Sequence, residues 1–219
     1  MVTMTAVLDH LVLAVPDLDE AVRDLAGRTG VVAAPGGSHP GRGTRNALLG
    51  LTWRGGSRCY LELLGPDPEQ VGVPPQDTML GFGRLGRGFA PRLHTWAVRP
   101  SDLDATVRTA REAGIEVGEA VAASRATPSG DRLAWRLAVP DPLGFGGAQP
   151  FLIDWQGTAH PSDAELPVLE LLGVELRHPD ADALARVLRV LGVDVPVVQA
   201  PQAGLGARLG TPRGPVELG

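Results

Sequence analysis

The sequence lacks lysine and contains one cysteine, Cys59, in 219 residues. A single cysteine excludes an internal disulfide and a cysteine-based zinc site. Cys59 lies in an apolar stretch, which is typical of a small buried side chain. All 20 basic residues are scattered arginines and the net charge is −5. Without a basic cluster, the sequence gives no support for nucleic-acid binding.

Aromatic residues and long hydrophobic runs are also scarce. Aromatics make up 4% of the chain, so the core must consist mainly of Val, Leu and Ala. No apolar run reaches the roughly 18 residues of a membrane helix, and no secretion signal is visible. The expectation is a soluble cytoplasmic protein without a membrane partner. The 29 glycines and 20 prolines fall between periodic segments, which predicts many short elements rather than disorder.

Residues 8–27 predict a strand, a proline corner and a helix. Pro16 ends the strand because it cannot donate to a sheet. Asp17 begins the helix as its N-cap, with Glu20 three residues later in a capping-box pattern. Apolar residues then recur at helical spacing, which predicts one buried face. Gly27 lies where the helix is expected to end.

This strand–corner–helix phrase occurs three times, each time followed by short apolar stretches. The pattern predicts an α+β protein made of repeated βαβββ modules. The first module covers 5–65 and the second 92–157, separated by a connector at 66–91. A third, degenerate module covers 167–219. This odd module either pairs with its counterpart in a second subunit, which predicts a homodimer, or packs on the connector.

Four polar residues interrupt apolar strands at equivalent points of the first two modules. His10 and His94 each lie six residues before the corner proline, and Glu62 and Asp154 lie in the last strands. Buried carboxylates are costly unless they are paired or bound to a cation. If the modules close on each other, these side chains suit a divalent transition metal such as Zn, Ni, Fe, Mn or Co. A structural polar cluster is the alternative.

Five further residues are candidates for substrate binding. The loop around His39, Arg45 and Asn46 suits a polar or anionic substrate group, or else is a capped loop in which Asn46 binds backbone groups. Tyr60 and Trp96 share a strand face with Glu62 and His94, respectively, by the two-residue period. Each of these two aromatic residues is expected either to line the pocket or to fill the core. His160 and His178 precede prolines in loops and are expected at the surface.

Several phrases resemble the glyoxalase-like domain family of the vicinal oxygen chelate superfamily, which includes glyoxalase I, extradiol dioxygenases and antibiotic-resistance proteins. The phrases are DHLVLAVPDLDEAV, HPGRGTRNALLGL, YLELLGPDP and PFLIDWQGTAHP. The resemblance covers nearly the whole chain and implies two βαβββ modules paired into a curled half-barrel. By position, it also implies metal ligands at His10, Glu62, His94 and Asp154. Asp154 departs from the glutamate that is usual in the family.

The resemblance implies a metal-dependent lyase or isomerase acting on a small molecule with adjacent oxygens. The metal would stabilise an enediolate as a Lewis acid, and Glu62 or Asp154 would move a proton as the catalytic carboxylate. One alternative is a metal-free protein that binds or sequesters a small molecule, as resistance-type relatives do. Another is an extradiol-type dioxygenase that uses iron.

Overall fold

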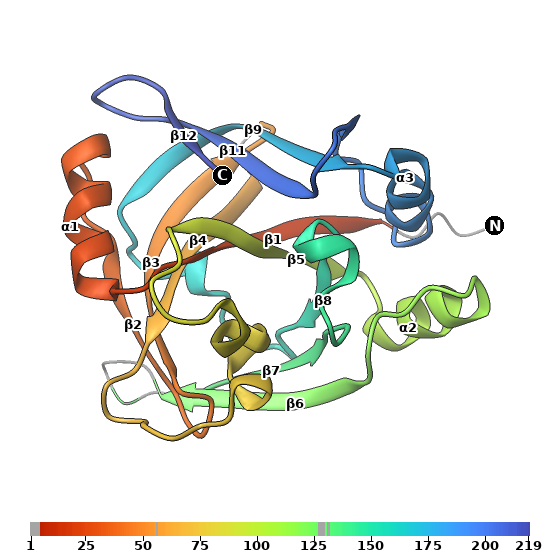
Figure 1. Ribbon diagram of the computed structural model, residues 1–219, viewed down its shortest axis with the longest axis horizontal. Helices are drawn as coiled ribbons and strands as arrows, with labels where there is room; N and C mark the ends of the chain where they lie inside the picture. The colour runs from red at the N-terminus through yellow and green to blue at the C-terminus, as the bar shows by residue number, and fades with distance from the viewer. Residues whose placement is uncertain (1–4, 56, 127–129, 131) are drawn as a thin grey trace.

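A computed structural model describes residues 5–55, 57–126, 130 and 132–219. The described strands form a single curled and unclosed sheet, with helices α1, α2 and α3 outside it (Figure 1). The fold is therefore α+β, as the sequence predicts. No helix in the described part of the chain is long and apolar enough to cross a membrane.

The first unit follows the predicted order of elements. Asp17 caps its helix by accepting a hydrogen bond from the Glu20 backbone N–H at 2.8 Å. The helix runs past Gly27 and ends at Gly30, which has the left-handed φ of 79° that favours glycine. The elements are β1 (Ala6–Ala14), α1 (Leu18–Thr29), β2 (Ala34–His39), β3 (Thr44–Trp53) and β4 (Ser57–Pro66).

The second unit repeats this order, again with an aspartate cap, Asp102, at the start of its helix. The strand after this helix begins only at Ala120, because residues 115–119 are a loop after Gly114. The elements are β5 (Arg92–Pro100), α2 (Leu103–Glu112), β6 (Ala120–Ala126), β7 (Arg132–Ala138), the 3₁₀ turn η3 (Gly144–Gly147) and β8 (Phe151–Asp154). A further 3₁₀ turn, η4 (Pro161–Asp163), follows.

The third unit extends the same sheet. Its first strand pairs in parallel with β3, with Leu51 opposite Leu169. Asp180 caps its helix. The division into modules and the homodimer remain predictions. The elements are β9 (Val168–His178), α3 (Ala181–Val190), β10 (Val197–Gln199), β11 (Gly204–Gly210) and β12 (Val216–Leu218).

The strands are ordered β12-β11-β9-β3-β4-β1-β5-β8-β7-β6, with β2 on β3 and β10 on β9. The first two units therefore meet at the antiparallel pair β1–β5. One face of the sheet packs against the three helices in a large apolar core, to which they contribute residues such as Leu25, Val107 and Leu184. The other face is concave and encloses a smaller cluster that includes Tyr60 and Phe151.

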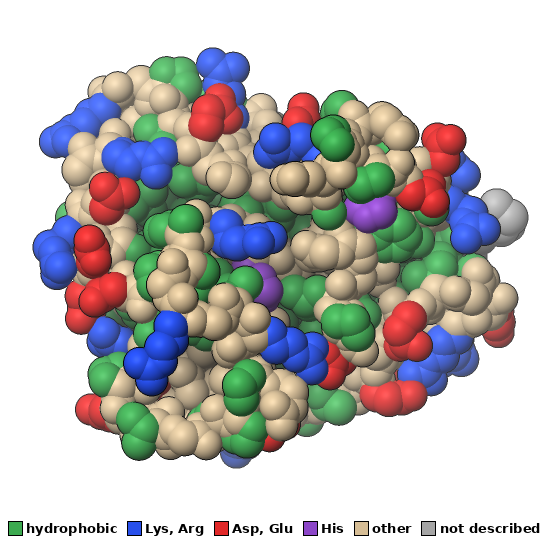
Figure 2. All heavy atoms as spheres, viewed as in Figure 1, with side chains coloured by type: hydrophobic (Ala, Val, Ile, Leu, Met, Phe, Trp, Pro, Cys, Tyr) green, Lys and Arg blue, Asp and Glu red, His purple; other side chains and the backbone are tan. Residues whose placement is uncertain are grey.

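The connector between the first two units covers the concave face. It contains the 3₁₀ turns η1 (Pro75–Asp77) and η2 (Met79–Leu85), which lie in front of the sheet in Figure 1. Leu80 and Phe82 of η2 are buried in the concave-side cluster. Basic and acidic side chains are intermingled over the molecular face in Figure 2, in agreement with the absence of a basic cluster in the sequence.

Candidate active site

A small cavity of about 40 Å³ lies inside the curled sheet, with buried polar side chains in its wall. Nε2 of His10 is 3.7 Å from one oxygen of the Glu62 carboxylate, and Nε2 of His39 is 3.7 Å from the other. All three side chains are buried. The cavity therefore joins two imidazoles and one carboxylate, contributed by β1, β2 and β4.

Asp9 holds His10 from behind. This carboxylate is fully buried, and its Oδ1 lies 2.7 Å from Nδ1 of His10. Burial by itself would raise the pKa of Asp9, but hydrogen bonds from His10 and His160 outweigh this effect and hold the pKa well below its usual range. Ionised Asp9 only accepts hydrogen bonds, so His10 donates through Nδ1. Nε2 of His10 then faces Glu62 and the cavity.

The other carboxylate oxygen of Asp9 interacts with side chains from three further parts of the chain. Nε1 of Trp155 and Nε2 of His160 each donate to Oδ2 at 3.1 Å, and the Arg99 guanidinium lies 3.4 Å away. His160 also caps η4 by accepting a hydrogen bond from the Ser162 N–H. Its side chain is only 9% exposed, so the expected surface position of His160 was wrong.

Asn46 holds Glu62 from the other side. Its amide donates to Oε1 of Glu62 at 2.5 Å, and its own oxygen accepts from the Gly37 N–H at 2.9 Å. Asn46 therefore binds the loop backbone, which is one of the two roles that the sequence left open. It also lines the cavity, where substrate binding stays a prediction. His39 beside it bonds through Nδ1 to the hydroxyl of Thr44 at 2.9 Å.

Aromatic rings form much of the remaining cavity wall. Tyr60 stacks on the His10 imidazole with ring centres 4.5 Å apart and an angle of 15°. Phe151 meets the same imidazole edge-on at 5.4 Å. Trp135 and Trp155 also line the cavity. The imidazole is therefore held between rings. Tyr60 lines the cavity and also belongs to the concave-side cluster, and substrate binding by Tyr60 stays a prediction.

His94 does not join His10 and Glu62, because both strands of the seam contain a β-bulge. In β1 the extra residue is Asp9, and in β5 it is His94 itself, between Leu93 and Thr95. Equal spacing from the corner prolines therefore does not give equivalent positions. Nε2 of His94 instead bonds the Leu80 backbone carbonyl at 2.9 Å. Burial lowers the pKa of His94 despite this bond, which favours the neutral imidazole.

Asp154 lies on the opposite face of its strand. Phe151, Ile153 and Trp155 line the cavity, so the alternation of a strand directs the intervening Asp154 outward. There it is opposite Arg136 in the sheet register and accepts a hydrogen bond from the Gln156 N–H. Because Asp154 points away from the cavity, its predicted roles as metal ligand and catalytic carboxylate were wrong.

The four predicted ligands therefore do not converge. Among the described residues, no group of three or more His, Cys, Asp and Glu side chains is arranged to hold a metal ion. Glu62 is already bound by an amide donor, and His94 by a carbonyl. The four residues that the family resemblance implies as ligands therefore do not fit one shared divalent metal.

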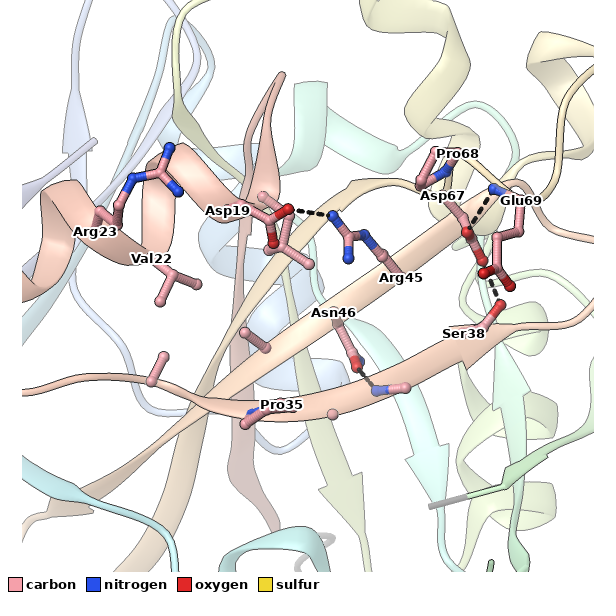
Figure 3. Close-up of a pocket in the computed structure, with 15 residues that line it drawn as sticks. Asp19, Val22, Arg23, Pro35, Ser38, Arg45, Asn46, Asp67, Pro68 and Glu69 are labelled. Carbon is pink, nitrogen blue, oxygen red and sulfur yellow. Dashed lines mark hydrogen bonds and ion pairs between the residues drawn. The ribbon is translucent and has the colours of Figure 1, made fainter. Parts of the chain in front are cut away.

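Arg45 and Trp96 lie outside the cavity. Arg45 lines a separate groove of about 610 Å³ between α1 and the β2–β3 hairpin, where its guanidinium binds Asp19 at 2.9 Å (Figure 3). Trp96 is fully buried on the helix-covered face and donates through Nε1 to the Ala148 carbonyl. Trp96 therefore fills the core, which was the alternative to a pocket role.

Sequence reasoning missed Asp9, Trp155 and His160. A signal for Asp9 was present, because two polar residues stand side by side in an otherwise apolar strand. Regular alternation would direct only one of them inward, whereas the bulge at Asp9 lets both act on the same site. The sequence gives no comparable signal for His160, which lies 151 positions from Asp9.

One solved structure among those similar to this chain supports the fold. A hypothetical protein from Staphylococcus aureus is 13% identical, with a TM-score of 0.69 over 90% of this chain and 87% of its own. A methylmalonyl-CoA epimerase in complex with methylmalonyl-CoA is 20% identical, with a TM-score of 0.47 over 72% of this chain and 99% of its own. The methylmalonyl-CoA epimerase of Mycobacterium tuberculosis is 25% identical, with a TM-score of 0.39 over 67% of this chain and 84% of its own.

No curated protein matches the sequence. The profile of the glyoxalase-like domain family matches residues 8–192, from the centre of β1 to the end of α3. This match covers most of the chain and agrees with the curled sheet and its paired units. The chain belongs to the glyoxalase-like domain family of the vicinal oxygen chelate superfamily.

Proposed function

We propose that the protein is a lyase or isomerase of glyoxalase type, which moves a proton within a small molecule that carries adjacent oxygens. The observation that carries the proposal is the facing pair of His10 Nε2 and Glu62 Oε2, 3.7 Å apart and buried in the wall of a small cavity. A carboxylate and an imidazole with an acceptor nitrogen, held together away from water, are suited to moving protons within a substrate.

Each residue of the pair has a distinct role in this reaction. Glu62 removes the proton from a carbon next to a carbonyl and returns it to the neighbouring carbon. His10 takes the proton of the adjacent hydroxyl through Nε2 and gives it to the former carbonyl oxygen, so that the hydroxyl becomes the new carbonyl, while Nδ1 stays bound to Asp9. Asn46 fixes the Glu62 carboxylate through Oε1, which leaves Oε2 for the substrate. No step is routed through a metal ion, because His94 and Asp154, two of the four ligands that the resemblance implies, lie away from His10 and Glu62.

The test is proton exchange in heavy water. Wild-type protein is incubated with a panel of small 2-hydroxy ketones and 2-hydroxy aldehydes, and deuterium incorporation is followed by NMR. We expect exchange that Glu62→Gln lowers on the order of 100-fold, as for the loss of a general base. Asp154→Asn is the matched control, because Asp154 lies on the outer face and its loss should leave the rate unchanged. Equal rates in wild type and Glu62→Gln would contradict the proposal.

The second candidate is a small-molecule binding protein without catalysis. The aromatic wall of the cavity favours it, because aromatic side chains also suit an apolar ligand. The same panel separates the two functions. Ligands that raise the melting temperature but never exchange protons would favour binding alone.

A further inference from the structure

A second pocket lies directly outside the central cavity. Its volume is about 190 Å³, and it is enclosed by η1, η2 and the strands β6 and β7. Met79, Leu80 and Leu137 line both spaces. These three side chains therefore form a thin partition between the outer pocket and the His10–Glu62 pair.

The outer pocket has a positive balance of charge. Arg42 and Arg84 line it, and the one carboxylate in its wall is Asp141. Arg84 and Asp141 bind each other through a two-point ion pair. Arg42 has only a backbone partner, the Asp77 carbonyl at 3.2 Å, and within the described residues no carboxylate pairs with it. The unpaired charge of Arg42 is available for an anion.

Leu80 closes the partition in a backbone conformation that leucine rarely adopts. Its φ is 53°, and that of the next residue, Gly81, is 64°. Both lie in the left-handed region, which is unfavourable for a bulky side chain. Nε2 of His94 binds the Leu80 carbonyl and holds this turn in place. Such a strained turn beside a cavity is suited to a segment that moves.

The small volume of the central cavity also limits the size of the group that it can hold. Its volume of about 40 Å³ is far below the 300–1,000 Å³ of common ligand sites. A substrate must therefore extend beyond the central cavity. The partition at Leu80 separates this cavity from the outer pocket, which contains the unpaired charge of Arg42.

We infer that the outer pocket binds the anionic group of the substrate, a small organic acid or phosphate ester, while its reacting end reaches His10 and Glu62 past Leu80. The inference rests on the proposed function and names the substrate class for that site. His94 is then a positioning residue for the Leu80 gate.

The anion site is tested by binding without turnover. Protein carrying Glu62→Gln is titrated with pyruvate and, separately, with inorganic phosphate, and amide signals are followed by NMR. We expect the signals of residues 76–84 to shift. A further Arg42→Gln change should weaken binding about fivefold, whereas Asp141→Asn should strengthen it by releasing Arg84. The anion that binds more tightly identifies the substrate class.

Arg186→Gln is the control, because it removes the same charge from an exposed position on α3 that has no part in either pocket. Equal weakening by Arg42→Gln and Arg186→Gln, or signal shifts confined to other grooves, would overturn the anion site. Because these titrations require no catalysis, their outcome is independent of whether proton exchange is observed.

The gate is tested by chemical access to His10. Leu80→Gly removes the side chain from the partition and suits the positive φ. We expect diethyl pyrocarbonate to modify His10 several-fold faster in this variant, as measured by mass spectrometry, with His178 as the internal reference. Melting curves check that the variant folds. Unchanged labelling of His10 in a folded variant would overturn the gate.

Discussion

At the scale of single residues, Asp9 positions the side chains of the site although it does not line the cavity. A fully buried carboxylate is stable only if donors replace its water, and Asp9 has the imidazoles of His10 and His160 together with the indole of Trp155. These donors come from β1, from the start of η4 and from the residue after β8. The carboxylate therefore joins parts of the chain that are remote in sequence and also selects the tautomer of His10.

Replacement of Asp9 by Asn should be strongly destabilising. The amide keeps the shape, but its NH₂ group faces hydrogen-bond donors, and the imidazoles lose their charged partner. We expect a loss of about 3 kcal/mol in the free energy of unfolding, as for other broken buried pairs, measured by urea denaturation. Asp104→Asn is the control, because Asp104 is exposed and pairs with Arg136 at the surface. A loss in Asp9→Asn no greater than in the control would refute this role.

At the scale of elements, the sequence predicts strands, caps and helices well but does not predict register. Apolar periodicity and three aspartate caps give α1, α2 and α3, because these signals are local. The bulges in β1 and β5 depend on cross-strand packing between residues about 85 positions apart, as for His10 opposite Ala97. His10 and Glu62 were therefore predicted together correctly, whereas His94 and Asp154 were not.

The β2–β3 hairpin supplies the prediction at this scale. A Cβ atom on Gly36 would lie 2.1 Å from Oδ1 of Asn46, so Gly36→Ala must displace the amide that holds Glu62. We expect a loss of about 1–3 kcal/mol, the usual cost of overpacking, and slower proton exchange. Gly173→Ala is the control, since a Cβ there meets nothing within 4 Å. Thermal unfolding and the heavy-water assay measure the two effects.

At the scale of the whole molecule, the third unit is an extension of the first rather than an appendage. Its strand β9 pairs with β3, and a single apolar core joins residues of all three units, including Leu11, Leu152 and Leu176. The predicted division at residue 167 therefore separates repeats in the sequence, while the core continues across it. Elements that share a core are expected to unfold together.

Tryptophan fluorescence can test this coupling, because Trp53, Trp96, Trp135 and Trp155 all precede the third unit. Leu184→Ala creates a cavity under α3, where Leu184 is fully buried, and should cost about 3 kcal/mol. If the core unfolds as one, the tryptophan transition in urea shifts by the same amount as the circular dichroism transition. Leu172→Ala, at a side chain that is 44% exposed in the same unit, should move neither. A fluorescence transition that stays in place while circular dichroism shows an earlier step would instead identify residues 167–219 as an independently folding unit.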